Sequence, residues 1–313
     1  MTLVLTRSDL EAVLDPADCI AALREGFCRA DAAPVTGQRV RTDLPFPGTA
    51  TALIPGVLPG VEAYTVKVNA KFPGARPALR GVICLHSGRD GELLALLDSA
   101  TVTAWRTGLA AALGTHVLAD PAEDGAVGVV GAGAQAELTV RGLAVLRGRR
   151  ELVVHDTDGG RAAAFAARHG GRVVDSAPQV AARAGLVLTA TWSRVPLLGL
   201  ADIRPGQHVT SLGADEPGKR ELAADLLEAS LLVVDDRELA VRTGVLGAAG
   251  LDAGAAHATL GEVLRGERPG RTGPEARTVY APVGLPWQDL ALAWLAYGRA
   301  ERAGRGRRID LLA

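Results

Sequence analysis

Apolar positions change their spacing along the first part of the chain, and these changes predict its elements. After the pair Asp15-Pro16, a typical helix start, apolar residues recur at helical spacing up to about residue 30. From Val40 to Leu97 they form short runs between Pro and Gly residues. This pattern predicts an antiparallel sheet, followed by a helix, with strands at 50–54, 63–68, 81–85 and 93–97 and the helix at 101–118.

After the polar segment Asp120–Gly125, strand-like and helical patterns alternate, which predicts a parallel sheet with right-handed crossovers. The predicted pieces are 126–130, 134–147, 151–156, 159–169, 172–175, 179–184 and 185–190, then strands at 208–212, 231–234 and 277–281. A terminal helix over 289–302 lies beyond this parallel domain and is expected to return to the first. We therefore predict an α/β protein with a Rossmann domain at 121–283 and an α+β domain at 1–120 and 284–313.

A glycine-rich turn follows the first strand of the predicted parallel domain and has the spacing Gly-x-Gly-x-x-Ala. Gly131 allows the sharp reversal, Gly133 lets the backbone approach a pyrophosphate, and Ala136 keeps the helix close to the sheet. The N–H groups of the helix start, at Ala134 and Gln135, then face the phosphates. These residues predict a dinucleotide site.

Two residues at strand ends extend this prediction. Asp156 follows the run 151–155, where an acid that binds the ribose hydroxyls is expected. Its charge would repel a 2′-phosphate and favours NAD, while the nearby Arg161 leaves NADP as an alternative. Thr191 ends a later strand on the same edge and is expected to line the cofactor.

Composition narrows the class of protein. The 313 residues are 48% hydrophobic and carry a net charge of −1, so no global charge favours nucleic acid or a membrane surface as partner. Three cysteines without Cys-x-x-Cys spacing fit a reducing compartment. The start of the chain has no apolar signal core and no long uncharged apolar stretch appears, so we expect a cytoplasmic protein. The histidines show no metal-like spacing, and we expect no metal.

Five segments resemble the ornithine cyclodeaminase/mu-crystallin family, which also contains alanine dehydrogenases and ketimine or imino-acid reductases. They occur in family order at Val40–Thr42, Tyr64–Val68, Gly91–Asp98 with Thr103–Thr107, Gly131–Ala136 and Ser211–Glu221. The segments Gly284–Asp289 and Gly306–Leu311 are similar to its C-terminal pattern. The resemblance implies a homodimer joined through the sheet of the first domain, with the substrate between that sheet and the nicotinamide.

The resemblance also implies which residues bind a small amino or imino acid. Arg41 and Arg106 match the two carboxylate-binding positions, with Arg39 as the alternative if the register is shifted. In relatives the pair Arg106-Thr107 also faces the cofactor phosphates. Relatives commonly continue with two alanines, whereas Gly108 and Leu109 follow here.

The expected catalytic residues are Lys67 and Asp215. Lys67 lies in a strand between two valines and projects to the opposite face from them, and burial beside arginines would disfavour its charged form. By the resemblance it moves a proton or binds the substrate, with Lys71 as the nearest competitor. Asp215 follows a strand at the carboxyl edge of the parallel sheet and matches a position that contacts the substrate nitrogen.

Three functions follow from these residues. The first is an NAD-dependent amino-acid dehydrogenase or imino-acid reductase. The second is an ornithine- or lysine-type cyclodeaminase, a lyase that returns the hydride and shows no net redox change. Ornithine cyclodeaminases carry a glutamate three positions before the proline of a Met-Pro motif, and Ala52 stands there before Pro55. This replacement favours the first function. The third, a non-catalytic crystallin-like binding protein, is disfavoured by Lys67, Arg106 and Asp215.

Overall fold

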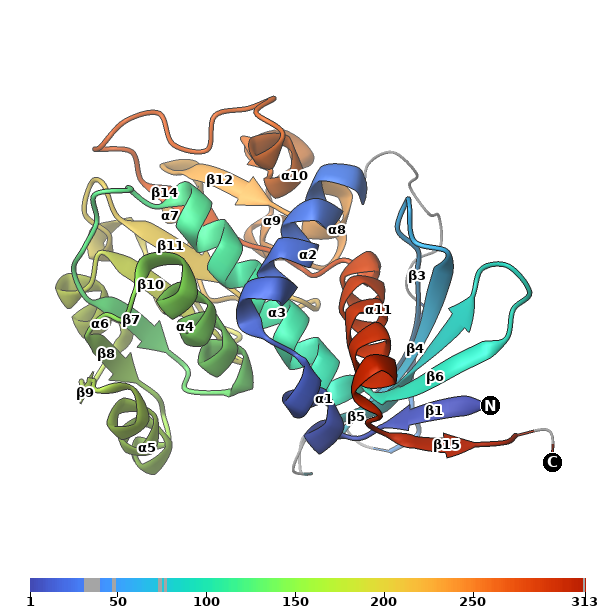
Figure 1. The fold of residues 1–313 in the computed structure, drawn as a ribbon. Coiled ribbons are helices and arrows are strands. Elements are labelled where there is room, and N and C mark those ends of the chain that lie inside the picture. Colours follow the sequence, from blue (N-terminus) through green and yellow to red (C-terminus); the bar gives the residue numbers. More distant parts are fainter. Residues whose placement is uncertain (31–39, 47–48, 73–74, 76–77, 312) are drawn as a thin grey trace. The chain divides into compact units, whose positions relative to one another are not determined.

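The computed structural model describes residues 1–30, 40–46, 49–72, 75, 78–311 and 313 (Figure 1). The chain divides into two compact units, unit 1 with Met1–Arg106 and Leu285–Ala313, and unit 2 with Thr107–Gly284. This division and the one proposed from the sequence differ in residues 107–120 and in Gly284. Residues 107–118 form the second part of one continuous helix, α3 (Ser99–Leu118).

A mixed sheet forms the centre of unit 1. Its strand order is β15-β1-β6-β5-β4-β3-β2, with the bounds Arg307–Ile309, Thr2–Leu5, Leu93–Asp98, Leu79–Ser87, Ala63–Lys71, Ala50–Gly56 and Val40–Asp43. The four predicted strands are confirmed as β3 to β6, which pair antiparallel. The sequence did not predict that β1 pairs parallel with β6 or that β15 extends the sheet.

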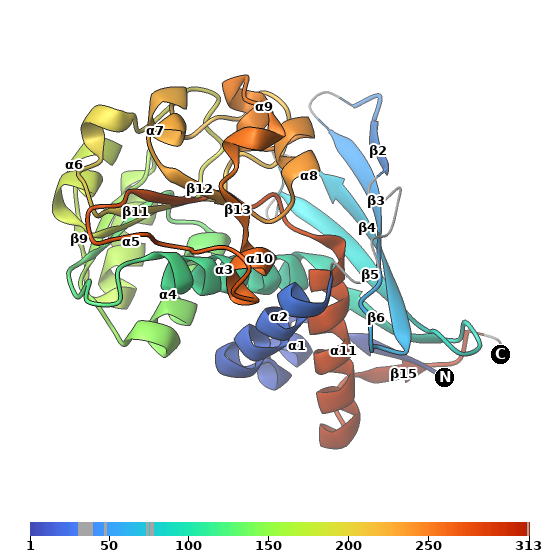
Figure 2. The same cartoon turned by 90° about the horizontal axis from the view of Figure 1, so that it is seen from above.

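Helices α1 (Arg7–Val13), α2 (Pro16–Arg29) and α11 (Pro286–Ala303) complete unit 1, and α11 contacts α2, β3 and β4 (Figure 2). As predicted, Asp15 caps α2 by accepting hydrogen bonds from the first-turn amides. A Cβ on Gly26 would lie 2.1 Å from the Trp287 ring, so only glycine allows this close approach of α2 and α11. The terminal helix therefore returns to the first domain, as expected.

Unit 2 contains a fully parallel sheet, as predicted. Its strand order is β13-β12-β14-β11-β10-β7-β8-β9, with the bounds Ala258–Thr259, Leu231–Val234, Thr278–Tyr280, His208–Ser211, Leu186–Thr189, Val127–Val130, Leu152–His155 and Arg172–Val173. The chain starts at β7 in the middle, builds outward to β9 and then resumes on the other side at β10. This reversal places the switch point, where such sheets bind ligands, at the carboxyl ends of β7 and β10.

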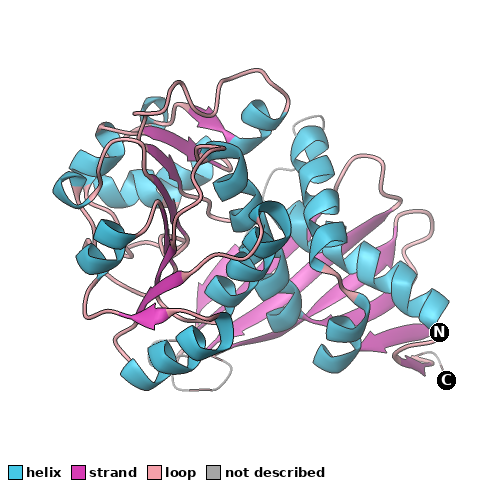
Figure 3. Cartoon of the chain, turned by 60° about the vertical axis from the view of Figure 1, so that its left-hand side comes forward, coloured by secondary structure: helices cyan, strands magenta, loops and turns pink. Residues whose placement is uncertain are grey.

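Helices cover both faces of this parallel sheet (Figure 3). One apolar core lies under α3, α4 (Ala134–Arg147) and α5 (Gly159–His169). The other lies under short helices that the sequence predicts only in part: α6 (Ala177–Arg183), η2 (Leu200–Asp202), α7 (Ala224–Glu228), α8 (Arg237–Arg242), α9 (Val245–Ala249) and η3 (Ala253–Ala255), with α10 (Leu260–Leu264) after β13. Within the described residues, no helix combines the length and apolar character needed to span a membrane.

Candidate functional site

The predicted dinucleotide turn connects β7 to α4 in unit 2. Gly131 has φ +94°, and a Cβ there would lie 2.5 Å from the Ala190 carbonyl oxygen, so glycine is required. At Gly133, the N-cap of α4, a Cβ would meet no atom within 4 Å, and no side chain caps the helix. Open space therefore lies beside the uncapped start of α4, an arrangement that fits a bound pyrophosphate.

Asp156 follows β8 and contacts this turn directly. Its Oδ2 accepts a 2.8 Å hydrogen bond from the Ala132 amide, and its Oδ1 accepts one from the Asp158 amide. The Asp156 side chain is 5% exposed, and the Arg161 guanidinium lies 3.5 Å from Oδ2. The acid predicted to bind the ribose thus also fixes the glycine turn.

A buried cluster of charges lies in unit 1. Lys67 Nζ donates a 2.5 Å hydrogen bond to Asp289 Oδ2, and Arg106 Nε lies 3.3 Å from Asp289 Oδ1. Arg106 also donates to Gln288 Oε1 at 3.2 Å. All four side chains are buried, and Lys67 is only 1% exposed. We call Lys67, Arg106, Gln288 and Asp289 the buried cation cluster; it carries two positive charges and one negative charge.

The local sequence explains how each member reaches this cluster. In β4, residues 63, 65, 67 and 69 alternate with more exposed neighbours, so Lys67 projects to the covered face, as predicted. Arg106 lies in the first half of α3. Gln288 and Asp289 lie in the first turn of α11, which begins at Pro286, three residues earlier than the sequence predicts.

Asp289 is the principal residue that the sequence did not identify as functional. The resemblance included the segment that contains it, but the apolar helix pattern gave it no role. The signal was an acid inside an otherwise apolar helix face, next to Gln288. Such an acid needs a buried cationic partner.

Several buried polar atoms near the cluster have no hydrogen-bond partner among the described residues. They include Gln288 Nε2, Asp289 Oδ1 and Thr65 Oγ1. Thr65 and Lys67 share one face of β4. Buried polar atoms are nearly always satisfied by protein, water or ligand, so this group fits a polar ligand.

The other predicted substrate residues are described in part. Lys71, the competitor of Lys67, is half-buried at the end of β4. The Arg41 backbone pairs with Ala52 in β3, which pairs with Asn69 in β4, so residue 41 shares the sheet face of Lys67. The Arg41 side chain and all of Arg39 lie outside what the structure describes.

Asp215 and Thr191 both lie at the carboxyl edge of the parallel sheet in unit 2. Lys219 Nζ donates a 2.6 Å hydrogen bond to Asp215 Oδ1, and the Asp215 side chain is 43% exposed. The Thr191 hydroxyl and amide both donate to Glu221 Oε1. Thr107 begins unit 2, and its buried hydroxyl has no hydrogen-bond partner among the described residues.

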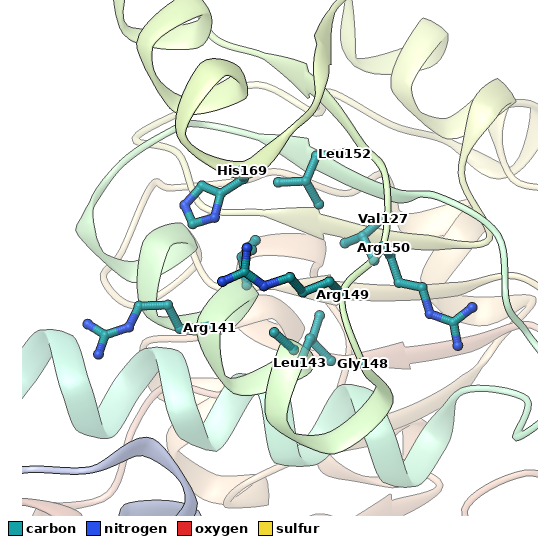
Figure 4. Close-up of a pocket in the computed structure, with 10 residues that line it drawn as sticks. Val127, Arg141, Leu143, Gly148, Arg149, Arg150, Leu152 and His169 are labelled. Carbon is teal, nitrogen blue, oxygen red and sulfur yellow. The ribbon is translucent and has the colours of Figure 1, made fainter.

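The structure thus brings together Lys67 and Arg106 in unit 1 and, separately, the glycine turn with Asp156 in unit 2. A pocket of about 110 Å³ lies elsewhere in unit 2, at the opposite edge of the sheet (Figure 4). Val127 and Leu152, the first residues of β7 and β8, line it with Arg149 and His169. It contains none of the predicted site residues. Among the described residues no three His, Cys, Asp or Glu side chains form a metal-binding group.

The chain is similar to known proteins over most of its length. The model of the ornithine cyclodeaminase/mu-crystallin family matches residues 1–304. The alanine dehydrogenase of Archaeoglobus fulgidus is 29% identical, over 98% of each chain. The ketimine reductase mu-crystallin of Mus musculus is 30% identical, over 77% of this chain and 79% of that protein.

Solved structures agree with this result. An archaeal alanine dehydrogenase dimer with bound NAD has a TM-score of 0.90 at 27% identity and 99% coverage of both chains. The Δ1-pyrroline-2-carboxylate reductase of Thermococcus litoralis, in complex with NADH and L-proline, has a TM-score of 0.91 at 27% identity, over 98% of this chain and all of that one. A lysine cyclodeaminase that recognises L-lysine, L-ornithine and L-2,4-diaminobutyric acid has a TM-score of 0.88 at 26% identity, over 99% and 95%.

Proposed function

This chain belongs to the ornithine cyclodeaminase/mu-crystallin family, and we propose that it is an NAD-dependent oxidoreductase acting on the C–N bond of a small α-amino or α-imino acid. The observation that carries the proposal is the buried cation cluster. Its two cations share the single carboxylate of Asp289, and a bound substrate carboxylate would add a second negative charge beside them. An α-carboxylate is the group that such acids share.

Arg106 supplies the carboxylate contact in this proposal. Its Nε faces Asp289 and its Nη1 donates to Gln288, while Nη2 makes no hydrogen bond with a described residue. A guanidinium binds carboxylates through a planar fork, and the contacts of Nε and Nη1 fix the plane of this fork. Substrate recognition therefore rests on a preoriented arginine.

Lys67 handles the proton at the substrate nitrogen. NAD, when bound, accepts the hydride from the α-carbon or returns it there. The hydrogen bond to Asp289 orients Lys67 Nζ, and in the reductive direction we assign to Lys67 Nζ the donation of a proton to the substrate nitrogen. In the oxidative direction the neutral amine accepts it.

The unit 2 site fits NAD. Open space at Gly133 and the uncapped start of α4 suit the phosphates, and the buried carboxylate of Asp156 suits the ribose hydroxyls of NAD. Relatives bind NAD or NADH. Arg161 lies 3.5 Å from Asp156, and an arginine there could bind a 2′-phosphate. NADP therefore remains the alternative cofactor, and its affinity is to be compared with that of NAD.

The cyclodeaminase alternative requires a partner for the distal ammonium of the substrate. Ala52 pairs with Asn69 on the sheet face that also carries Lys67, so the position of the family glutamate holds a methyl group. We therefore favour net redox chemistry. The deciding measurement incubates the protein with NADH and imino acids, and with NAD and amino acids including ornithine, following NADH absorbance, ammonia and products by mass spectrometry.

Net NADH conversion supports the proposed function. Ammonia release from ornithine or lysine without net NADH change contradicts it and identifies the cyclodeaminase. A Lys67→Ala variant should lose about 10²–10⁴-fold in kcat with NADH affinity retained. Lys71→Ala, on the same strand outside the cluster, is the matched control and should keep its turnover. Full turnover of Lys67→Ala would refute the mechanism.

We also propose that the protein is a homodimer joined through the free face of the unit 1 sheet. Val40, Leu53, Val68 and Val82 are cross-strand neighbours on the face opposite Lys67. The first three are 56%, 46% and 37% exposed, which forms an apolar row across four strands. A relative of known structure is a dimer.

A further inference from the structure

Glu221 is a fully buried carboxylate in unit 2 that accepts five hydrogen bonds. Oε1 accepts from the amide and the hydroxyl of Thr191, at 2.6 and 2.7 Å. Oε2 accepts from the Thr189 hydroxyl at 2.7 Å, the Ser211 hydroxyl at 2.8 Å and the Gly213 amide at 2.7 Å. None of these five donors is charged: two are backbone amides and three are hydroxyls.

The donors come from two neighbouring strand ends. Thr189 is the last residue of β10 and Ser211 is the last residue of β11. Thr191 and Gly213 each lie two residues beyond these ends. Glu221 therefore connects the carboxyl ends of β10 and β11, at the sheet edge where the ligand is expected.

Each connected segment leads to a predicted functional residue. A Cβ on Gly131 would lie 2.9 Å from Thr191 Cγ2, so Thr191 packs against the phosphate turn. Gly213 precedes Asp215 by two residues, and a Cβ on Gly213 would lie 2.4 Å from Glu221 Cδ. The position of Glu221 thus determines where Thr191 lies beside the phosphate turn. It also determines where the segment that carries Asp215 begins.

We propose that Glu221 is a positioning residue that holds Thr191 against the phosphate turn and sets the start of the Asp215 segment. The inference rests on the proposed function for its ligands. Its basis is the set of five donors, which places one backbone amide on each carboxyl oxygen, so both oxygens have to accept.

The substitution Glu221→Gln tests whether two accepting oxygens are needed at this position. The two oxygens each accept from one backbone amide, Thr191 N on one side and Gly213 N on the other. In either orientation, the glutamine side chain of this variant would direct its NH₂ group at a backbone N–H that cannot rotate away. One of the two strand ends must therefore move.

The experiment compares wild type, Glu221→Gln and Glu262→Gln. Glu262 forms a bidentate pair with Arg237 and caps α10 beside the far strand β13, so it is the control for loss of a structural carboxylate. NADH affinity is measured by NADH fluorescence, Tm with and without NADH, and turnover as kcat and KM. Glu221→Gln should weaken NADH binding about tenfold or more and lower kcat. Glu262→Gln should lower Tm alone.

Glu221→Gln with a lower Tm but unchanged NADH affinity and kcat would overturn the inference, because it would show a structural role only. If Glu221→Gln does not fold, Ser211→Ala removes one donor to Oε2 and should weaken NADH binding less; unchanged binding in that variant also overturns it. Wild-type protein that binds no NADH would instead refute the proposed function.

Discussion

At the scale of single residues, Asp289 is bound by two buried cations at once. Lys67 and Arg106 could both be identified from the sequence, because both lie in segments that resemble the family and an arginine inside an apolar helix start is unusual. Asp289 could not be assigned to them, since its separation from Lys67 is 222 residues and no local spacing relates the two. The buried ion pair of Lys67 and Asp289 forms only when the fold brings β4 and α11 together, so it could not be predicted from the sequence.

Replacing Asp289 tests its part in the cluster. Asp289→Asn keeps the shape but removes the carboxylate that Lys67 and Arg106 share. We expect the free energy of unfolding to fall by roughly 3–5 kcal/mol, because an uncompensated buried charge is costly. We also expect kcat to fall, since Lys67 loses its orienting partner. Chemical denaturation and steady-state kinetics measure both quantities.

The control for Asp289→Asn is Asp98→Asn. Asp98 accepts hydrogen bonds from the amide and hydroxyl of Thr101 at the start of α3 and lies outside the buried cation cluster. This variant should lose about 1 kcal/mol of stability and keep its kcat. Wild-type kcat in Asp289→Asn would show that the pair is structural.

At the scale of elements, α3 packs closely on α4 through Gly108. A Cβ there would lie 2.5 Å from Leu138 Cβ, 2.8 Å from the Gln135 carbonyl oxygen and 2.9 Å from the Thr139 amide nitrogen. The sequence showed that glycine replaces the alanine common in relatives, but not why. The reason is contact with the backbone of the first turns of α4, which no pattern in one sequence displays.

Gly108→Ala should therefore displace α4 and the phosphate turn that precedes it. We expect a loss of about 1–3 kcal/mol in stability from overpacking, with weaker NADH binding. Gly114→Ala, on the same helix, would crowd the Tyr280 ring instead, and should cost stability while NADH affinity stays constant. Titration of NADH fluorescence compares the two variants. Equal NADH affinity in both would contradict this account.

A buried imidazole links β11, β14 and the C-terminal part of α3. His208 is bonded to the hydroxyls of Thr278 and Thr210, and Thr210 contacts Thr115 at 2.7 Å. Thr278 Oγ1 donates to the Leu118 carbonyl, so it accepts from His208 Nδ1–H. Burial, aided by Arg271 and Arg147, lowers the pKa of His208 from 6.5 to about 3, which favours the neutral imidazole.

This shift predicts a pH dependence of stability. The unfolded chain binds a proton at His208 below pH 6.5 and the folded chain does not until about pH 3, so stability falls as pH falls through this window. Between pH 7 and pH 5 His208 should account for a loss of about 2 kcal/mol in the free energy of unfolding. Urea denaturation at each pH measures it.

The matched variants for this pH dependence are His208→Gln and His257→Gln. His208→Gln should flatten the dependence, whatever its own stability. His257, which bonds the Pro269 carbonyl, is half-buried at the rim of unit 2, and its replacement should leave the wild-type slope. An unchanged slope in His208→Gln would show that other groups are responsible.

At the scale of the whole molecule, the sequence predicted the fold class and the parallel order of the elements in unit 2, because periodicity and glycine turns are local signals. The sequence did not predict strands β1 and β15 at one edge of the unit 1 sheet. β1 joins β6 across about 90 residues of chain, and β15 joins β1 from the other end. Such pairings depend on which strand edges remain unpaired in the assembled sheet. A single sequence contains no local signal for those edges.

The free apolar face of that sheet predicts the oligomeric state. Leu53→Asp places a charge in the middle of the row formed by Val40, Leu53, Val68 and Val82. We expect this variant to be monomeric at micromolar concentration, because a buried unpaired charge opposes association. Val173→Asp, at an exposed valine of unit 2, should leave the mass unchanged. Light scattering after gel filtration gives the mass, and a monomeric wild type would contradict the proposal.

The distance along the chain between Lys67 and Asp289 also determines when the site can form during synthesis. A ribosome makes the two cations early and their shared anion near the end, so a nascent chain holds Lys67 and Arg106 in water until α11 emerges. A prematurely terminated product lacks the carboxylate of Asp289 that both cations share. Interrupted translation should therefore yield products that remain open at this sheet and are substrates for proteolysis, rather than partly active enzymes.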